Sequence, residues 1–316
     1  MSEFFLELFS EEIPSSLQKN LRENLLDSLN KLFAENYISF KKSSSYSTPN
    51  RLIILFEGLK RKVILKSEET KGPNVNAPKI ALEGFIRSND ITKKDLFKKK
   101  IDKGEFYFFK TKPKKINTHD LLEKFVPLVL QKIQWQKSMR WGEFDLNWGR
   151  PLKSIIALFN NKVVNFDFFH LKSNNLTYLE GSNDDKSKKI NSFKSYLSIL
   201  KSENIILNHE ERKNIIERKM SVICNNKKLQ NTFDPKLIQE VVNLVEKPNI
   251  IACKFDEAYL KIPQEILIIT MQQHQKYFPL FDDNNRLTNS FLLVSNLPDV
   301  KGYIKKGNQR VIEARL

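Results

Sequence analysis

Glu3-Phe4-Phe5-Leu6-Glu7-Leu8-Phe9 is a short and largely apolar run, which predicts a buried β-strand near the start of the chain. The string Ser10-Glu11-Glu12-Ile13-Pro14 reads as a turn. Beyond it, leucines at helical spacing predict a helix with one apolar face: Leu17, Leu21, Leu25, Leu29 and Leu32. A second apolar run at 51–56 predicts a strand that pairs with the first, so the chain opens as a sheet covered by a helix.

The remaining sequence continues this mixture of helices and strands. Further strands are predicted at 62–66, 105–110, 153–159, 162–169, 249–254, 276–281 and 290–296. Further helices are predicted at 79–88, 118–134, 190–202, 208–224, 234–246 and 263–273. Residues 71–73 (Lys-Gly-Pro) read as a turn, and 307–316 as the opening of a last helix. The predicted fold class is α+β, with two or more mixed α/β domains and antiparallel-rich sheets.

The charge of the chain suggests a polyanionic partner. The 316 residues hold 53 Lys and Arg against 37 Asp and Glu, a net charge of +16. Such an excess favours nucleic acid or an anionic membrane surface as a partner. An AT-rich coding sequence also enriches lysine, asparagine, isoleucine and phenylalanine without any selection for a partner. Both explanations of the charge stay open at this point.

Several common kinds of site are excluded by the small residue inventories. The nine glycines never form G-x-G or the start of G-x-x-x-x-G-K, so neither usual phosphate-binding loop for ATP or NAD is present. Cys224 and Cys253 are far apart and form no C-x-x-C pair, and the four histidines lack paired spacing, so no metal site is predicted. The acidic first residues do not resemble a signal peptide, and no apolar run is long enough to span a membrane.

The most basic stretch is 93–115, where ten lysines flank an aromatic strand at 105–110. Lysines interleaved with aromatic rings can bind single-stranded nucleic acid through charge and base stacking. The simpler interpretation is a half-buried strand beside solvated lysines, and we favour it on the sequence alone.

A series of short strings runs along the whole chain in a fixed order. The two most specific are Met139-Arg140-Trp141-Gly142 and the run from Met271 to Pro279, Met-Gln-Gln-His-Gln-Lys-Tyr-Phe-Pro. The others are Phe9 to Pro14, Pro49-Asn50-Arg51-Leu52, Lys71-Gly72-Pro73, Arg150-Pro151, Leu244-Val245-Glu246-Lys247-Pro248, Val294-Ser295-Asn296 and Gly307-Asn308-Gln309-Arg310-Val311. This series resembles the β subunit of bacterial heterotetrameric glycyl-tRNA synthetase, over essentially the whole chain.

The domain organisation follows from the predicted elements and from the resemblance, which also leaves one region in doubt. The order of predicted elements gives an N-terminal α/β domain at 1–136 and a second α/β domain at 137–300, with a polar boundary loop near 171–189. The resemblance implies that 301–316 is the start of a helical HD-type domain. Family members are longer, so the chain is expected to match their N-terminal portion only, without the HD-type and anticodon-binding parts. At 179–183 the family commonly has a Gly-His-Arg-Phe-like string, of which only Gly181 remains here.

The resemblance also implies a function, partners and a compartment. It implies a component of glycine–tRNA ligase that binds tRNA(Gly) and assembles with the α subunit as α2β2 in the cytoplasm. In the family, ATP and Mg²⁺ are used by the α subunit, so no cofactor and no catalytic residue is assigned to this chain. Two alternatives remain: a stand-alone RNA-binding or editing-type domain, and a non-functional truncated remnant.

Candidate residues for contact with tRNA or the α subunit combine cations with aromatic rings, because phosphates attract cations and unpaired bases stack on rings. The candidates are Arg140, Trp141, Arg150, His274, Gln275, Lys276, Tyr277, Phe278, Arg310 and Arg315. The lysines of 93–115 and Lys305 and Lys306 are expected to follow phosphates. Each candidate also has a structural interpretation, because large aromatic side chains are usually part of a core.

Overall fold

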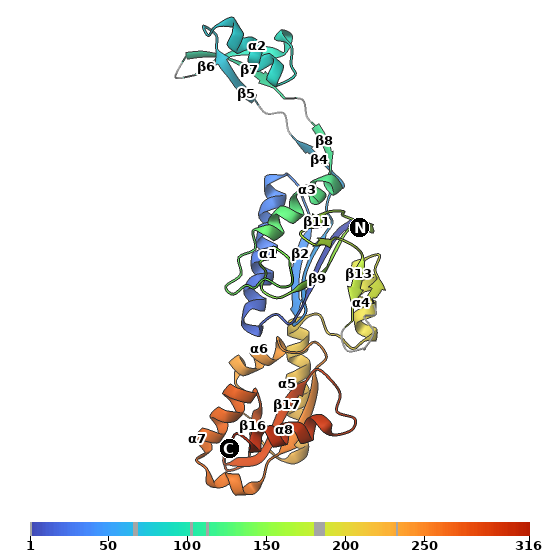
Figure 1. Cartoon of the computed structure of the whole chain (residues 1–316), viewed down its shortest axis with the longest axis vertical. Coiled ribbons are helices and arrows are strands. Elements are labelled where there is room, and N and C mark those ends of the chain that lie inside the picture. The colour runs from blue at the N-terminus through green and yellow to red at the C-terminus, as the bar shows by residue number, and fades with distance from the viewer. Residues whose placement is uncertain (1, 66–68, 102–103, 112–113, 180–186, 232) are drawn as a thin grey trace.

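The computed structural model describes residues 2–65, 69–101, 104–111, 114–179, 187–231 and 233–316. These residues form an elongated molecule with three parts along its long axis (Figure 1). We call residues 62–117 the arm, residues 2–61 and 118–207 the central unit, and residues 208–316 the C-terminal unit. The arm and the C-terminal unit lie at opposite ends of the central unit.

A five-stranded antiparallel sheet forms the middle of the central unit, in the order β10–β9–β1–β3–β2. Its strands are β1 (Glu3–Ser10), β2 (Lys42–Thr48), β3 (Arg51–Glu57), β9 (Leu152–Phe159) and β10 (Lys162–Val163). The predicted pairing of the first strand with 51–56 is confirmed, with Phe4 opposite Phe56. On its other side β1 pairs with β9, so the sheet takes strands from both sides of residue 136. The predicted domain limits stay a prediction.

Helices cover both faces of this sheet (Figure 1). On one face lie α1 (Ser15–Glu35) and α3 (Thr118–Gln131), and α1 inserts Leu21, Leu25 and Leu29 into a core with Phe4 and Leu6. On the other face lies α4 (Phe193–Ser202), and its Tyr196 packs against Phe5. Because both faces are buried, β1, β3 and β9 read as largely apolar runs rather than as alternating patterns.

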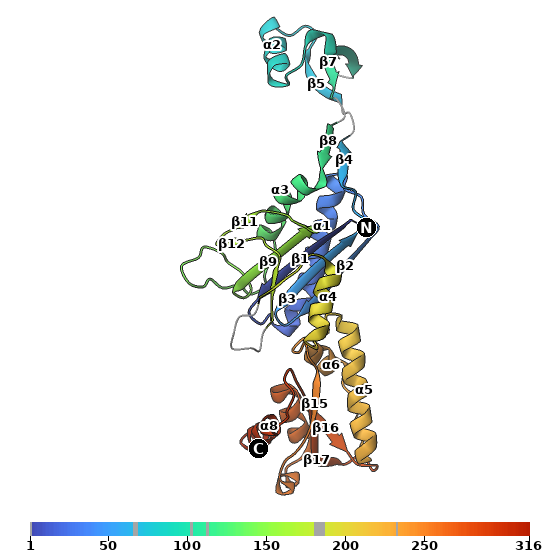
Figure 2. The ribbon, with the colours of Figure 1, turned by 90° about the vertical axis from the view of Figure 1, so that its right-hand side faces the viewer.

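The arm is connected to the central unit through the paired strands β4 (Lys62–Leu65) and β8 (Lys114–Asn117) (Figure 2). At its far end, β5 (Glu69–Asn74), β7 (Gly104–Lys110) and β6 (Leu96–Ile101) form a separate sheet in that order. The helix α2 (Lys79–Ser88) and the short 3₁₀ helix η1 (Lys93–Asp95) complete the arm. The turn predicted at 71–73 is wrong, because these residues lie within β5, where the register shifts between Lys71 and Asn74.

Short hairpins and a tryptophan-rich segment complete the central unit next to β9 and β10. The hairpins are β11 (Asp167–Phe168) with β12 (Leu171–Lys172), and β13 (Leu176–Tyr178) with β14 (Ser187–Lys189). The ring of Trp148 is buried and packs against Trp135, with 5.0 Å between ring centroids. Gly149 lies under Trp135 so closely that a Cβ there would come within 1.9 Å of the ring. The backbones of Met139 and Trp148 pair to close this segment.

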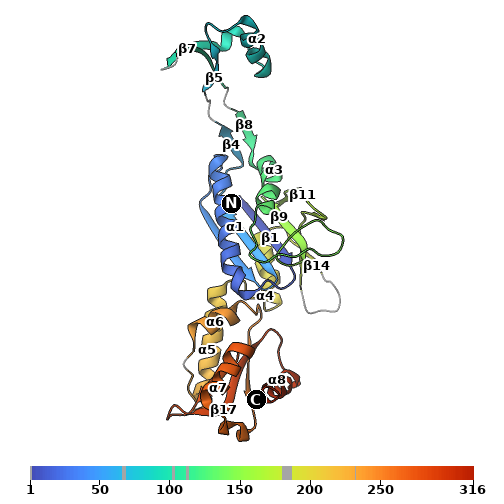
Figure 3. The ribbon, with the colours of Figure 1, turned by 60° about the vertical axis from the view of Figure 1, so that its left-hand side comes forward.

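The C-terminal unit has its own three-stranded sheet, β15–β17–β16, and separate apolar cores on its two faces. The strands are β15 (Asn249–Lys254), β16 (Phe278–Phe281) and β17 (Leu287–Ser295). The helices are α5 (His209–Lys227), α6 (Pro235–Val242), η2 (Glu257–Lys261), α7 (Gln264–Ile269), the π-helix η3 (Thr270–His274) and α8 (Tyr303–Glu313). Figure 3 shows α5 and α6 beside the central unit and α8 farther away.

The predicted α+β class is confirmed, since helices alternate with several small antiparallel sheets. Seven strands of the described residues were not predicted: β2, β5, β6, β8, β12, β13 and β14. The last three lie within 171–189, which was expected to be a loop, and the single strand expected at 162–169 is divided into β10 and β11. The last helix begins at Tyr303 rather than near 307. Among the described residues, no helix is both long and apolar enough to cross a membrane.

Candidate nucleic-acid interface

The arm holds half of the excess positive charge of the chain. Residues 62–117 include 15 Lys and Arg against seven Asp and Glu, a net +8 out of +16. Lys103 and Lys112, two of the lysines expected to follow phosphates, lie outside the described residues. The charge is therefore concentrated on a part of the molecule that projects away from the body (Figure 2).

The two faces of the arm sheet differ in what covers them. Phe109 points toward α2, where Phe85 packs edge-to-face on it with centroids 5.7 Å apart. The next residue back along β7, Phe108, points to the opposite face because side chains alternate along a strand. There it stacks with Phe97 of the neighbouring strand β6, at 6.1 Å between centroids. In the described part of the arm, α2 is the one α-helix, so this second face carries no helix.

Lysines and phenylalanines share this second face, which we call the open face: Lys71, Phe97, Lys99, Phe106, Phe108 and Lys110, with Glu69 among them. The Lys71 Nζ lies 3.8 Å from the centroid of the Phe106 ring, and the Lys99 Nζ 5.6 Å from that of Phe108. Phe97 and Phe106 are half-buried, and Phe108 is buried. Cations lie over the rings as cation–π pairs.

Glu69 holds two of these lysines. Its carboxylate lies 2.6 Å from the Lys99 Nζ and 3.8 Å from the Lys110 Nζ. The hydrogen bond from Lys99 lowers the pKa of Glu69. All three side chains are exposed or nearly so, so this ion pair exchanges easily with solvent or with another anion. The aromatic strand is thus half-buried, as the simpler sequence interpretation expected, and it also carries cations on an uncovered face.

The candidates near the tryptophans lie on the central unit. Arg140 is exposed, and Trp141 is half-buried against His170, with ring centroids 5.7 Å apart. Arg150 is half-buried, and its Nε donates to the carbonyl of Glu12 at 3.0 Å. Arg150 therefore fixes the turn after β1, whereas Arg140 has an exposed side chain.

The candidate string from His274 to Phe278 lies in the C-terminal unit, and only His274 of its five residues is exposed. Tyr277 and Phe278 are buried, and the Tyr277 hydroxyl donates to Asn308 on α8 at 2.5 Å. Burial raises the pKa of Tyr277 to about 12. Lys276 has a left-handed backbone with φ of +59° and pairs with Glu240 at 3.0 Å. Residues 274–278 therefore form the connection between the π-helix η3 and the strand β16.

The remaining candidate arginines are on the C-terminal unit. Arg310 on α8 and Arg315 just after it are both exposed. Neither lies near the arm, so the structure does not bring the candidates together as one surface (Figure 1). The string at 179–183, where the sequence departs from the family pattern, lies outside the described residues from 180 onward.

Two buried carboxylates and two buried arginines were not recognised in the sequence. Arg51 lies with its Nη1 3.1 Å from Glu7 and its Nε 3.6 Å from Glu246, and these three side chains are almost fully buried. Tyr196 donates to the same Glu7 carboxylate. Burial opposes the charge of Arg51, but Tyr196, Glu7 and Glu246 raise its pKa overall. We call Glu7, Arg51, Tyr196, Arg212 and Glu246 the buried cluster.

Arg212 fastens the C-terminal unit to the central sheet. Its Nη2 donates to the carbonyl of Ser47 at the end of β2 (2.9 Å), and its Nε to that of Val242 (3.1 Å). Burial lowers the pKa of Arg212 to about 10, partly offset by the charge of Glu246. Glu246 follows α6 in the C-terminal unit, whereas Glu7 and Arg51 belong to the central sheet. The buried cluster therefore joins the two units, and its two carboxylates balance its two guanidinium groups.

The strings quoted from the sequence meet in the same region. The amide of Ser10 donates to the carbonyl of Asn50 (2.8 Å), and the Nε of Arg51, in the same string as Asn50, lies 3.6 Å from the carboxylate of Glu246. The side-chain oxygen of Asn296 accepts hydrogen bonds from the backbone amides of Glu246 and Lys247. Strings that are far apart in the sequence thus form the junction between the two units. One signal was present in the sequence: Glu7 interrupts the apolar run from Phe4 to Phe9.

One group of three side chains in the described residues has the chemistry to hold a metal ion: His119, Asp120 and Glu123. The Nε2 of His119 lies 3.0 Å from the Val163 carbonyl, and Glu123 accepts the amide of Asn165 at 3.0 Å. His119 and Glu123 thus join α3 to β10 and to Asn165 just after it, and we assign them that structural role.

Comparisons with known proteins identify relatives over the whole chain. A family model described as "Glycyl-tRNA synthetase beta subunit" matches residues 4–316. A protein named glycine–tRNA ligase beta subunit from Rickettsia peacockii (strain Rustic) is 36% identical over 317 residues, covering 100% of this chain and 48% of the relative. Proteins of the same name from Rickettsia prowazekii (strain Madrid E) and Rickettsia canadensis (strain McKiel) are 37% and 35% identical, again over 100% of this chain, and it covers 48% and 47% of them. The chain spans about half the length of these curated relatives.

Proposed function

Because this chain belongs to the glycyl-tRNA synthetase beta subunit family, we propose that it acts as a subunit of glycine–tRNA ligase. In this proposal it binds tRNA(Gly) and assembles with the α subunit in the cytoplasm. The α subunit supplies the chemistry with ATP and Mg²⁺, and this chain supplies RNA contacts. An α2β2 assembly remains our expectation.

The observation that carries the RNA-binding role is the open face of the arm. It presents Lys71, Lys99 and Lys110 beside Phe97 and Phe106 on a projecting element with half of the net charge. Lysines that neutralise phosphates release the counterions condensed on the nucleic acid, and unpaired bases stack on accessible aromatic rings. Charge and rings on one uncovered face provide both contributions at once.

The test compares two triple variants of equal net charge. The first, Lys71→Gln, Lys99→Gln and Lys110→Gln, removes cations from the open face. The control, Lys19→Gln, Lys31→Gln and Lys162→Gln, removes three exposed lysines of the central unit. Retention of tRNA(Gly) is measured by filter binding over a range of salt concentrations. The slope of log affinity against log salt should fall by about 2 in the arm variant, because each lost phosphate contact removes about 0.7–0.9.

If the salt dependence of tRNA binding falls equally in the two triple variants, the affinity for RNA depends on the net charge of the chain and not on the arm. Assembly is tested separately, by co-purification with the α subunit and by glycylation of tRNA(Gly) in the presence and absence of the remaining half of a full-length β subunit. A chain that binds tRNA but never the α subunit would support a stand-alone RNA-binding domain instead.

A further inference from the structure

The strand β15 forms an edge of the C-terminal sheet, since it pairs with β17 alone in the described residues. The amide of Phe255 donates to the carbonyl of Asn289 in β17 at 3.0 Å. In an antiparallel ladder, hydrogen-bonded residues alternate with residues whose N–H and C=O point away. Odd-numbered residues of β15 therefore bond to β17, and the backbone groups of Ile250 and Ala252 point outward.

Two side chains confirm this alternation and limit the open part of the edge. The Lys219 Nζ on α5 donates to the carbonyl of Pro248 at 3.0 Å. At the other end, the Gln309 side chain on α8 donates to the carbonyl of Lys254 at 2.5 Å. Both acceptors belong to the even-numbered, outward row. The N–H and C=O groups of Ile250 and Ala252 lie between these two closed ends.

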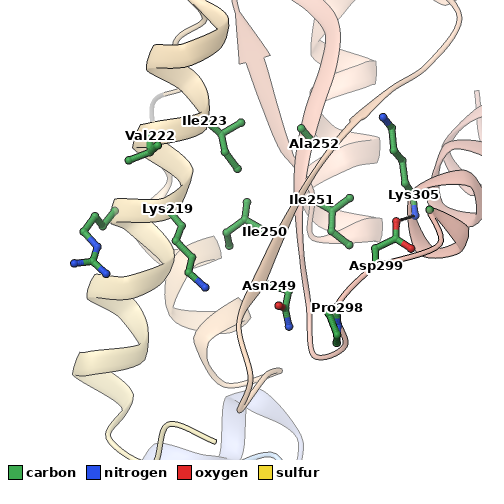
Figure 4. A pocket seen from close by; sticks show the side chains of 12 residues that line it. Lys219, Val222, Ile223, Asn249, Ile250, Ile251, Ala252, Pro298, Asp299 and Lys305 are labelled. Carbon is green, nitrogen blue, oxygen red and sulfur yellow. Dashed lines mark hydrogen bonds between the residues drawn. The ribbon is translucent and has the colours of Figure 1, made fainter. Parts of the chain in front are cut away.

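A groove of about 660 Å³ lies over this open edge (Figure 4). Arg218, Lys219, Val222 and Ile223 of α5 form one wall, residues 249–252 form the floor, and the segment before α8 with Lys305 forms the other wall. The volume lies within the usual range of about 300–1,000 Å³ for binding pockets. Val222 is 53% exposed, so the wall offers apolar surface beside free backbone donors and acceptors.

The charges around the groove select among possible occupants. Arg218, Lys219 and Lys305 are cationic, whereas the carboxylate of Asp299 is already engaged by the amides of Ile304 and Lys305. A second copy of this chain would bring an equally cationic rim against the first. An occupant with carboxylates is attracted instead.

We propose that this edge binds an extended segment of a partner protein as a fourth strand, with small apolar side chains and flanking carboxylates. The segment adds hydrogen bonds to Ile250 and Ala252 and lies about 4.8 Å from β15. Its apolar side chains contact Val222 and Ile223, and its carboxylates contact Arg218 and Lys305. This binding is independent of the arm and of tRNA.

The probe is a blocked hexapeptide of alternating valine and threonine with a glutamate at each end. Saturating peptide should slow amide hydrogen exchange of Ile250 and Ala252 at least tenfold in the full chain. The substitution Ala252→Pro removes an outward-pointing N–H that is not hydrogen-bonded to β17. It should weaken peptide binding at least tenfold. Val222→Glu should weaken binding as strongly, whereas Val311→Glu, an exposed position on α8 outside the groove, should not.

A matched peptide with lysine at both ends should bind at least fivefold more weakly. The proposal is overturned if about 1 mM of the glutamate peptide leaves both amides unprotected, or if both peptides bind equally. It is also overturned if the free chain forms dimers that Ala252→Pro abolishes, because the occupant is then a second copy. Circular dichroism checks that each variant is folded.

Discussion

Arg51 shows how a single residue can determine the contact between two parts of a chain. Its guanidinium neutralises Glu7 within the central sheet and Glu246 from the C-terminal unit, and it lies 4.7 Å from the centroid of the Phe9 ring. The sequence offered Arg51 only as the first residue of a strand. Buried ion pairs cannot be distinguished from solvated charges until the fold brings their partners together, so this part of the structure was not predicted.

Arg51→Met should lower the free energy of unfolding by about 3–5 kcal/mol, because it leaves two buried carboxylates without their cation. Urea denaturation measures this change. Tyr196→Phe provides a milder variant, expected to cost about 1–3 kcal/mol through the lost hydrogen bond to Glu7. Lys153→Met is the control: it breaks an exposed pair with Glu11 at 2.8 Å and should cost less than about 1 kcal/mol. Equal losses for Arg51→Met and Lys153→Met would contradict a stabilising role of the buried cluster.

His209 at the start of α5 gives the junction a dependence on pH. Burial, and then the charge of Arg22, lower the pKa of His209 from its ordinary value of 6.5. The folded state therefore binds this proton less readily than the unfolded state. Stability is retained above about pH 6.5 and is lost as the pH falls from 6.5 toward the lower, folded pKa.

The free energy of unfolding should thus fall between pH 7.5 and pH 5.5, and the fall should be smaller in His209→Gln. Glutamine keeps an oxygen that can accept from Arg22, whose Nη2 lies 3.2 Å from the histidine Nε2. Urea denaturation of both proteins at the two pH values isolates this group from the carboxylates that titrate in both. An identical fall in the two proteins would assign the pH dependence elsewhere.

At the scale of elements, apolar patterns predicted most of the structure and polar patterns did not. The apolar runs predicted the ends of β1, β3, β9 and β15 to within one or two residues, because a short apolar run bounded by polar residues fits few structures other than a buried strand. The strand β2 reads Lys-Ser-Ser-Ser-Tyr-Ser-Thr and β6 reads Leu-Phe-Lys-Lys-Lys-Ile, so neither shows a clear strand pattern. Both are strands because they pair with apolar neighbours, β3 and β7.

The candidate site was predicted as a set of residues but not as a surface. Exposed Arg140 and buried Phe278 carry similar sequence signals, since cations and rings are neighbours in both strings. Which ring is available depends on strand register and on what packs above it. The open face of the arm became recognisable only when the pairing of β7 with β6 placed Phe97 beside Phe108.

Glu69→Gln gives an element-scale prediction that separates a binding face from solvated lysines. This substitution removes the carboxylate that holds Lys99 and Lys110 and repels phosphate. Affinity for tRNA(Gly) should rise about threefold or more, with a steeper salt dependence, because two cations become available for phosphates. Filter binding measures both quantities. Glu83→Gln on α2 of the same arm is the control for net charge, and an equal gain there would show that the open face has no special role.

At the scale of the whole molecule, the far end of the arm is an insertion between β4 and β8, and we expect these two strands to stay paired without it. Leu65 lies opposite Lys114 in the β4–β8 pair, so a two-residue Asn-Gly turn can replace residues 66–113. The four core clusters of the body hold no residue from 69 to 110. The shortened chain should therefore keep its fold, with its melting temperature changed by only a few degrees.

The same deletion should greatly reduce tRNA retention, and differential scanning calorimetry and filter binding together test both statements. A shortened chain that unfolds would show that the arm supports the body. One that retains tRNA as well as the intact chain would remove the arm from the proposed interface.

The pairing of β1 with β9 also sets the order in which the protein is completed during synthesis. β1 and β3 are finished at Glu57, but β9 begins only at Leu152. At about 5–20 residues per second, the ribosome needs roughly 5–20 s to make the intervening chain. During this interval the edge of β1 with Phe4, Phe5 and Leu6 lacks its second neighbour on the nascent chain. The nascent sheet β2–β3–β1 therefore presents an unpaired apolar edge, which other chains can pair with, until β9 has been synthesised.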